Sequence, residues 1–329
     1  MLTRAPETID QQLEEHRRAL TGYCYRMLGS SFEAEDAVQE TMVRAWRAAD
    51  RLESPAALKA WLYRIATNVC FDMLKGAQRR ARPIDLEDPS TADGVLDGGL
   101  SEDAWIHPIA DGKVIPEGGD PAEVAAAKET IRLAFVAALQ HLPPKQRGVL
   151  ILREVLHWKA SEVAELLDTS VASVNSALQR ARATLDSAGA DLSGPAAMDT
   201  AEERELLAKY VDAFERYDVA SLVSLLHEDA TQTMPPWRLW LRGREEIGKW
   251  FLGQGIGCKG SRLVTFEANG RPAYATYKPS GSGTYHPWGI CVVEMEDGRI
   301  TALQNFIYPD WFSAFGLPSQ LENGEPVSS

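Results

Sequence analysis

The chain has few cysteines, and none of them lies close to another. Its 329 residues include only Cys24, Cys70, Cys258 and Cys291, with no Cys-x-x-Cys pair and no zinc-type spacing. This scarcity excludes a disulfide-rich scaffold and a structural zinc fold. It predicts buried, reduced thiols in a cytoplasmic protein, with neither a metal ion nor a cofactor.

Long hydrophobic runs are also absent. No apolar stretch approaches the roughly 20 residues that span a bilayer. The N-terminal segment MLTRAPETIDQQLEEH has no apolar centre of the kind that signal peptides carry. We therefore expect no membrane span, no signal peptide and no membrane partner.

Positive charge is in short supply, but it is unevenly distributed. The chain has 34 Lys and Arg against 47 Asp and Glu, a net charge of −13. Residues 1–80 carry +1 and residues 123–198 are neutral, whereas residues 81–122 carry −8 and residues 199–329 carry −6. The acidity is thus concentrated in one connecting segment and the C-terminal third, and the other parts can present basic faces to a partner.

Residues 158–185 predict two short helices joined by a tight turn. Val171, Val174, Leu178, Ala181 and Leu185 recur at helical spacing, and Asp168-Thr169-Ser170 supplies turn and capping oxygens before them. The opposite face carries short or polar side chains and an arginine: Ala172, Ser173, Ser176, Gln179, Arg180 and Ala183. Such a face suits a recognition helix in the major groove of DNA. An amphipathic hairpin with a solvated face is the alternative.

A second candidate contact with nucleic acid lies in residues 54–83. Ser54-Pro55 is a helix-entry signal, and six cations against one acid give the segment a net charge of +5. Trp61, Tyr63 and Phe71 are interleaved with those cations, a combination that suits phosphate contact and stacking on an unpaired base. The alternative is a solvated basic helix end.

Residues 12–50 predict helices, with a break at Gly29-Ser30-Ser31. In the second of them, Val38, Met42, Ala45 and Trp46 are spaced for one buried face. Asp36, Gln39, Glu40, Arg44 and Arg47 occupy the exposed face. Taken alone, an acidic and polar face is usually only solvated.

Composition divides the rest of the chain. Residues 83–122 are rich in Pro, Gly and Asp and predict an acidic flexible linker, although a patch at Trp105-Ile106-His107-Pro108 suggests docking. A long helix is expected from Val124 until Pro143-Pro144. Beyond a second linker at 190–199, helices precede alternating strands and an Asp-Gly hairpin turn at 297–298, which predicts an α+β domain over 200–316. We expect residues 317–329 to be a disordered tail.

Three stretches, in this order, resemble an extracytoplasmic-function (ECF, group 4) sigma factor of bacterial RNA polymerase. AEDAVQETMVRAWR at 34–47 is similar to region 2.2, residues 54–80 to regions 2.3 and 2.4, and residues 142–185 to region 4. The resemblance covers residues 12–82 and 123–189. It implies two all-α domains, a region 2 bundle and a region 4 helix-turn-helix, and a protein that directs transcription initiation.

The resemblance assigns partners and residues. Core RNA polymerase, through its β and β′ subunits, would meet Asp36, Gln39, Glu40 and Arg44. The −10 element of promoter DNA would meet Lys59, Trp61, Arg64, Asn68, Asp72, Lys75, Arg79 and Arg80. The −35 element would meet Ser161, Thr169, Ser170, Ala172, Ser173, Ser176, Gln179, Arg180 and Arg182. The linker would thread through the polymerase toward the RNA exit path.

The C-terminal third resembles a SnoaL-like domain, the α+β cone also seen in nuclear transport factor 2. The resemblance lies in residues 213–251, NGRPAYATY at 269–277 and GRITALQNFIYP at 298–309, and the whole chain is similar to the actinobacterial sigma-G/sigma-J type. Where enzymes of this fold place an acid on the last strand, this chain has Gln304-Asn305, which cannot transfer protons near neutral pH.

We therefore expect no catalytic residue, and we expect the extension to act as a fused regulator. A small-molecule pocket formed by Trp237, Trp240, Trp250, Trp288 and Asn305 is a further expectation. The alternative from another class is a helix-turn-helix regulator fused to an isomerase- or hydrolase-type enzyme domain. Assembly with core polymerase would discriminate between these hypotheses.

Overall fold

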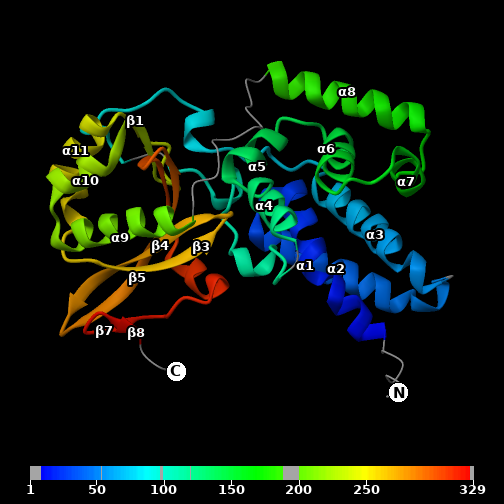
Figure 1. Ribbon diagram of the computed structural model, residues 1–329, viewed down its shortest axis with the longest axis horizontal. Coiled ribbons are helices and arrows are strands. Elements are labelled where there is room, and N and C mark those ends of the chain that lie inside the picture. Colours follow the sequence, from blue (N-terminus) through cyan, green and yellow to red (C-terminus); the bar gives the residue numbers. More distant parts are fainter. Residues whose placement is uncertain (1–8, 53, 97–98, 119, 188–199, 327–329) are drawn as a thin grey trace. The chain divides into compact units, whose positions relative to one another are not determined.

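The computed structural model describes residues 9–52, 54–96, 99–118, 120–187 and 200–326. These residues form two compact units. The helical unit combines the described residues of 1–80 and 111–192, and the sheet unit combines those of 81–110 and 193–329. Figure 1 shows the helices and strands of both units. The predicted fold class, helical domains followed by an α+β domain, is confirmed.

The helical unit begins with three helices and ends with a helix-turn-helix. In chain order they are α1 (Ile9–Leu28), α2 (Ser31–Arg47), α3 (Leu58–Met73), α4 (Pro121–Glu129), α5 (Leu133–Leu139), α6 (Pro144–Leu150), α7 (Ala160–Leu166) and α8 (Val171–Ser187). A π-helical turn, Ile151–Val155, continues α6. The predicted break between α1 and α2 is confirmed: Gly29 has a φ of 71°, and the Ser30 hydroxyl accepts from the backbone N–H of Glu33 at 3.2 Å.

The single long helix expected from Val124 is instead two helices, α4 and α5. The buried side chain of Arg26, on α1, donates to the carbonyl oxygen of Thr130 at 3.0 Å and to its hydroxyl at 2.7 Å. Arg132, which precedes α5, has a ψ of 142° and is outside helical geometry. A tertiary contact that local periodicity does not encode therefore accompanies the break.

The sheet unit is a curved, mostly antiparallel sheet in the order β2-β1-β6-β5-β4-β3. Its strands are β1 (Leu226–Thr233), β2 (Trp240–Arg242), β3 (Arg262–Ala268), β4 (Arg271–Gly281), β5 (Thr284–Glu296) and β6 (Arg299–Phe306). The pair β1 and β6 is parallel, and the predicted hairpin between β5 and β6 turns at Asp297-Gly298.

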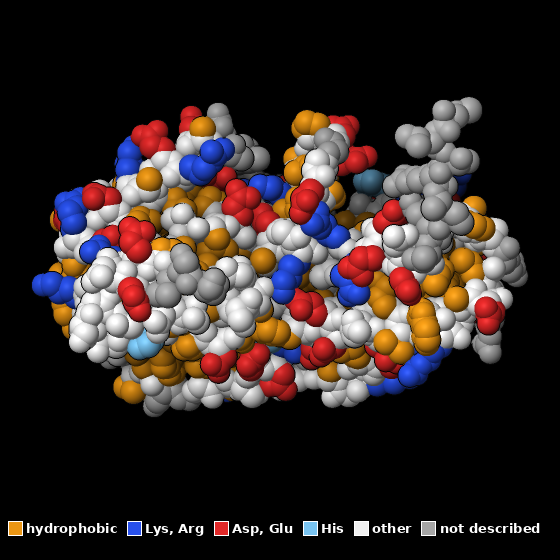
Figure 2. All heavy atoms as spheres, turned by 90° about the horizontal axis from the view of Figure 1, so that it is seen from below, with side chains coloured by type: hydrophobic (Ala, Val, Ile, Leu, Met, Phe, Trp, Pro, Cys, Tyr) orange, Lys and Arg blue, Asp and Glu red, His pale blue; other side chains and the backbone are white. Residues whose placement is uncertain are grey.

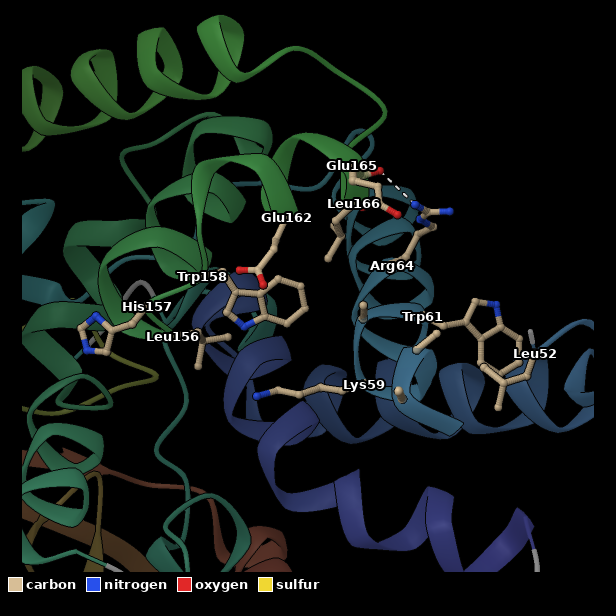
Figure 3. A pocket seen from close by; sticks show the side chains of 13 residues that line it. Leu52, Lys59, Trp61, Arg64, Leu156, His157, Trp158, Glu162, Glu165 and Leu166 are labelled. Carbon is tan, nitrogen blue, oxygen red and sulfur yellow. Dashed lines mark hydrogen bonds between the residues drawn. The ribbon is translucent and has the colours of Figure 1, made fainter. Parts of the chain in front are cut away.

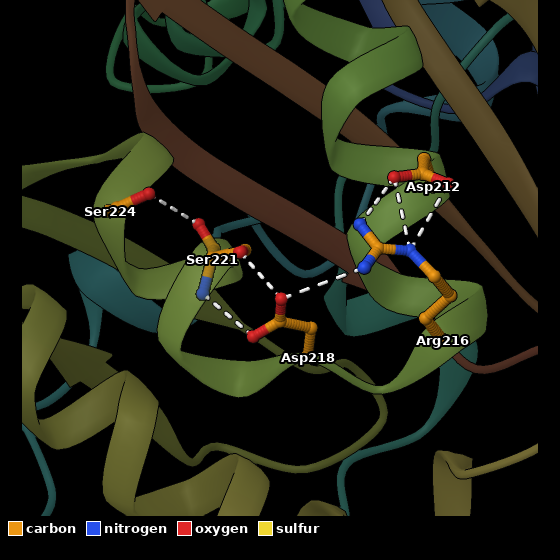
Figure 4. A network of polar contacts seen from close by, with 5 residues as sticks. All are labelled: Asp212, Arg216, Asp218, Ser221 and Ser224. Atoms are coloured by element: carbon orange, nitrogen blue, oxygen red, sulfur yellow. Dashed lines mark hydrogen bonds and ion pairs between the residues drawn. The ribbon is translucent and has the colours of Figure 1, made fainter.

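Three helices cover one face of this sheet: α9 (Thr200–Arg216), α10 (Val219–Leu225) and α11 (Arg244–Leu252). Tyr210 of α9 stacks on Tyr274 of β4, with ring centroids 5.5 Å apart. The junction of α9 and α10 is held by polar contacts (Figure 4), in which Asp218 accepts from the backbone and hydroxyl of Ser221 and lies 3.7 Å from Arg216. These contacts cap the N-terminus of α10.

The acidic linker differs from the expected structureless segment. Residues 87–110, here called the docked segment, belong to the sheet unit. The backbone N–H of Ser90 donates to Trp240, that of Leu100 to Pro236, and Ile109 and Asn269 exchange two hydrogen bonds of 2.9 and 3.0 Å. Composition misses this order because a loop can be held by the backbone and side chains of a distant domain, whatever its own propensity.

The suggested docking of residues 105–108 is confirmed within the sheet unit. Trp105 is fully buried, and the ring of His107 lies 4.7 Å from that of Trp311. The indole N–H of Trp311 donates to the Glu102 carboxylate at 3.2 Å. The segment is therefore attached to the sheet unit along most of its described length.

The expected disordered tail is ordered as far as residue 326. Two short strands, β7 (Leu321–Glu322) and β8 (Glu325–Pro326), pair with each other, and β7 pairs with β5. Leu321 is fully buried, and the Tyr277 hydroxyl donates to the Pro318 carbonyl at 2.8 Å. Residues 327–329 and the second linker at 190–199 lie outside the described residues.

The face drawn in Figure 2 carries both acidic and basic side chains. Among the described residues, no helix is both long and apolar enough to cross a membrane.

Candidate nucleic-acid interface

Helix α8 has the geometry expected of a recognition helix. It starts at Val171, where the Ser170 hydroxyl accepts from the backbone N–H of Ser173 at 3.2 Å. Its buried side chains are Val174, Ala177, Leu178, Ala181 and Leu185. The predicted stripe is confirmed except at Val171, the first residue of α8, which is 44 % exposed.

The predicted DNA-reading side chains of the helix-turn-helix are accessible. Thr169 is half-buried, and the others are exposed: Ser161, Ser170, Ala172, Ser173, Ser176, Gln179, Arg180 and Arg182. Arg182 forms an ion pair of 2.8 Å with Glu154 of the π-helical turn. Small residues at the start of α8 allow close approach to base edges, and Gln179 and Arg180 offer donors further along.

Helix α3 and the loop after it present the second predicted set. Lys59, Arg64, Asn68, Asp72, Lys75 and Arg79 are exposed, and Trp61 is half-buried. Lys75 donates to the Asp72 carboxylate at 2.7 Å and lowers the pKa of that group, and Arg44 of α2 lies 4.0 Å away. Asp72 is thus a charged acceptor at the end of α3.

Arg80 contradicts its predicted role as a phosphate contact. Its side chain is only 6 % exposed and donates to the Glu33 carboxylate of α2 at 2.7 Å. A buried guanidinium with an acidic partner is not available to DNA. Arg80 instead ties the end of the basic segment to the start of α2.

Three of the predicted −10 residues, Lys59, Trp61 and Arg64 of α3, line a groove of about 700 Å³ together with residues of the helix-turn-helix (Figure 3). Arg64 crosses it and donates to the backbone carbonyl of Glu165, on α7, at 2.9 Å. The ring of Tyr63 lies 5.1 Å from that of Trp158, and the Lys59 ammonium lies 5.9 Å from the Trp158 ring centroid. The two predicted DNA-reading regions are therefore packed into one unit.

A buried arginine joins the same two regions. Arg147 of α6 donates to the backbone carbonyl of Met27 at the end of α1 and, at 2.6 Å, to the side chain of Gln140. It is only 4 % exposed, and burial lowers its pKa to about 10. Several acceptors compensate for part of the cost of burying the charge.

Helix α2 presents the face predicted for core polymerase. Asp36, Gln39, Glu40 and Arg44 are exposed, and Arg44 donates to the Glu40 carboxylate at 2.7 Å. Trp46, predicted to be buried, is instead 60 % exposed. At 100° per residue it lies only about 20° from Gln39, which is the signal that could have identified it. It adds a large aromatic surface to the exposed face.

The aromatic residues proposed as a ligand pocket separate into two groups. Trp250, Trp288 and Asn305 line one cavity of the sheet unit, together with Tyr210, Tyr274, Gln232 and Cys258. Trp237 packs against the core, and Trp240 donates its indole N–H to the Glu87 carbonyl of the docked segment at 2.8 Å. The cavity measures about 20 Å³, which is room for one water molecule and not for a metabolite.

The side chains that line this cavity have little acid or base chemistry to offer near neutral pH. The described lining contains phenols, amides and one thiol, and burial raises the pKa of Tyr210, Tyr274 and Cys258. Gln232 Oε1 and Trp250 Nε1 have no hydrogen-bond partner among the described atoms. No group of His, Cys, Asp or Glu in the described part of the chain could hold a metal ion.

Three family descriptions match the chain in order. Sigma-70 region 2 matches residues 13–80, Sigma-70 region 4 matches residues 132–185, and the SnoaL-like domain matches residues 207–303. The ECF RNA polymerase sigma factor SigG of Mycobacterium tuberculosis is 41 % identical over 314 residues, which cover 94 % of this chain and 83 % of the relative. SigJ of the same organism is 27 % identical over 329 residues, covering 96 % of each.

A solved structure agrees with these matches. The crystal structure of Mycobacterium tuberculosis SigJ superposes with a TM-score of 0.61 at 25 % identity, covering 93 % of this chain and 99 % of that one. The two sigma-70 regions and the SnoaL-like domain thus occur in the same order in chains of similar length. With an exposed helix-turn-helix, a basic α3 and an exposed polar face on α2, the chain belongs to the ECF sigma factors, which direct transcription initiation by RNA polymerase.

Proposed function

We propose that this sigma factor reads −10 and −35 promoter elements with α3 and α8, docks on core polymerase with α2, and is regulated by its own SnoaL-like domain. The regulator acts by holding the linker between the two DNA-reading regions. The observation that carries this proposal is the docked segment, residues 87–110, in the sheet unit.

Hydrogen bonds and a buried side chain hold the docked segment in one position on the sheet unit. Gln254 donates to the carbonyl oxygens of Ala92 and Gly94, at 3.0 and 2.7 Å, and the Glu246 carboxylate accepts from the Ala92 N–H at 3.0 Å. Ala92 itself is part of the hydrophobic core of the sheet unit. A linker held in this way has less freedom to follow another path, such as the RNA exit path.

The size and chemistry of the cavity favour a regulator over an enzyme or a sensor. A volume of about 20 Å³ does not admit a substrate, and its lining lacks a group that titrates near neutral pH. The fold by itself does not decide between these roles, because SnoaL-like cones host both binders and catalysts. We therefore assign the domain a role through its contacts with the linker.

Run-off transcription with core polymerase tests the proposal. The full chain is compared with a truncation after residue 192 and with a Trp240→Phe/Gln254→Ala double variant, which loses three hydrogen bonds to the docked segment. The truncation and the double variant should change transcript yield in the same direction. Lys209→Ala, an exposed change on α9, is the matched control and should leave the yield unchanged.

The result that would contradict the regulatory role is equal output from all four chains. An absence of initiation from both the full chain and the truncation, with intact binding to core polymerase, would contradict the promoter-reading part. Separate binding assays with core polymerase distinguish the two.

A further inference from the structure

A short segment of the linker lies against the helices that carry the polymerase-docking face. Residues 111–117, here called the strap, belong to the helical unit and follow the docked segment without a gap. Val114 and Ile115 are buried. Arg18 of α1 pairs with Glu117 at 2.6 Å, and Lys113 pairs with Glu35 of α2.

The strap and the docking face share one groove. Its volume is about 830 Å³, and its walls are formed by α1, α2 and the strap. Asp36 and Gln39, two of the predicted polymerase contacts, line it beside Gly112, Lys113 and Val114. Glu35, the partner of Lys113, precedes Asp36 in the sequence. A partner that binds Asp36 and Gln39 therefore meets the strap at the edge of its site.

Gly22, in the middle of α1, lies next to the strap. A Cβ atom added at Gly22 would lie 3.8 Å from the Cβ of Val114 and 3.7 Å from its carbonyl oxygen, which are ordinary contact distances, and 3.0 Å from Nη1 of Arg26, which is a tight one. The strap therefore packs against α1 at this position.

We propose that the strap is an intramolecular competitor of core RNA polymerase, and that it must leave the groove between α1 and α2 before the full docking face is available. This inference rests on the proposed docking role of α2. Both ion pairs of the strap are partly exposed and therefore weak, which suits a contact that is to be displaced. Because the strap begins where the docked segment ends, whatever holds the docked segment also restrains the strap.

An engineered disulfide provides the direct test. The Cβ separation of 3.8 Å between positions 22 and 114 is the usual one in disulfides, and the four native cysteines are all buried. In a Gly22→Cys/Val114→Cys chain, oxidation should lock the strap in the groove. Affinity for core polymerase, measured by fluorescence anisotropy, should fall by at least about tenfold on oxidation and return on reduction. The reduced chain is the matched control for both substitutions.

Reversing the charge of Glu117 tests whether release of the strap strengthens binding to core polymerase. Glu117→Arg places two cations together and should release the strap, which should tighten binding to core polymerase by about two- to fivefold. Adding Arg18→Glu restores an opposite-charge pair and should return the affinity to that of the native chain. Equal affinity of the oxidised and reduced double-cysteine chains would overturn the proposal.

A Gln39→Arg variant separates this inference from the proposed function. If Gln39→Arg weakens binding to core polymerase while the oxidised double-cysteine chain binds normally, α2 carries the docking face and the strap does not compete for it. If it binds core polymerase like the native chain, the docking face lies elsewhere and the proposed competition fails with it.

Discussion

Arg79 and Arg80 are adjacent arginines with opposite surroundings. Arg79 is exposed, with a guanidinium nitrogen 3.1 Å from His141 Nδ1, whereas Arg80 is buried against Glu33. Sequence gives both the same charge and the same place after a basic helix. Only the packing of α2 beside residue 80 buries Arg80 and leaves Arg79 exposed.

Replacing each arginine should separate the two roles. Arg80→Ala removes the partner of Glu33 and should lower the free energy of unfolding by about 1–3 kcal/mol, toward the lower end because Glu33 is partly exposed. Arg79→Ala should change stability by less than about 0.5 kcal/mol and should weaken promoter binding. Urea denaturation measures the change in stability, and promoter-binding titrations measure the change in affinity. A destabilised Arg79→Ala chain would contradict this assignment.

The buried cysteines yield a second expectation at the same scale. All four are free and buried, and burial raises the pKa of Cys291 to about 12. Because the thiolate is the reactive form, the folded chain should react with a disulfide reagent at pH 8 at least about a hundredfold more slowly than the urea-unfolded chain. Fast reaction of a native thiol would contradict its burial.

The same burial has a consequence for stability in alkali. A group whose pKa is higher in the folded state stabilises the fold below its unfolded pKa, near 9 for a thiol, and that contribution is lost as the pH rises toward 12. The free energy of unfolding should therefore fall above pH 9. Cys291→Ala should reduce the slope.

Helix α8 carries two arginines with different surroundings, and we expect them to contact DNA differently. Arg182 is paired with Glu154, whereas Arg180 is exposed on the predicted reading face. Arg180→Ala should weaken −35 binding by about 1–3 kcal/mol and relax the sequence preference, if the side chain meets a base. Arg182→Ala should produce a smaller loss that is the same for every sequence. Titration of holoenzyme against −35 variants measures the difference, and a uniform loss for Arg180→Ala would leave it a phosphate contact.

On α2, the exposed Trp46 is the element's main unpredicted feature. Exposed tryptophans are frequent hot spots of protein interfaces, so Trp46→Ala should weaken binding to core polymerase by about tenfold or more. Because the side chain is 60 % exposed, thermal stability should change little. Arg47→Ala, its exposed neighbour, is the matched control. Unchanged affinity for Trp46→Ala would place the interface elsewhere on α2.

In the whole molecule, the two sigma regions are packed as one unit, and Arg147 lies at the contact. Arg147→Met keeps much of the volume but loses the bonds to Met27 and Gln140, and should lower the free energy of unfolding by about 2–3 kcal/mol. Lys145→Met, exposed on the same helix, should have no such effect. Thermal denaturation of the full chain tests this, and equal midpoints would show that the buried arginine contributes nothing.

Element types and the exposed face of α8 were predictable because they depend on local spacing. The start of α8 at Val171, its cap at Ser170 and the β5–β6 turn all follow from nearby residues. The position of Arg80 and the break between α4 and α5 were not predictable, because a residue distant in sequence decides each of them. The exposure of Trp46 was predictable from its helical angle, which places it about 20° from Gln39. Of the five residues of the candidate pocket, Trp250, Trp288 and Asn305 line one cavity, whereas Trp240 is bound to the linker.

By itself, the sequence determined the family, through stretches that resemble known sigma factors. It also determined the order of the helical and α+β parts and the small, polar exposed face of α8, because periodicity and composition carry these directly. Only the tertiary structure decided what becomes of the acidic linker. Its Pro, Gly and Asp residues predict no structure of their own, yet backbone groups and distant side chains hold residues 87–110 in the sheet unit and residues 111–117 on α1 and α2. Loop order of this kind arises from long-range hydrogen bonds and burial, which no local pattern encodes.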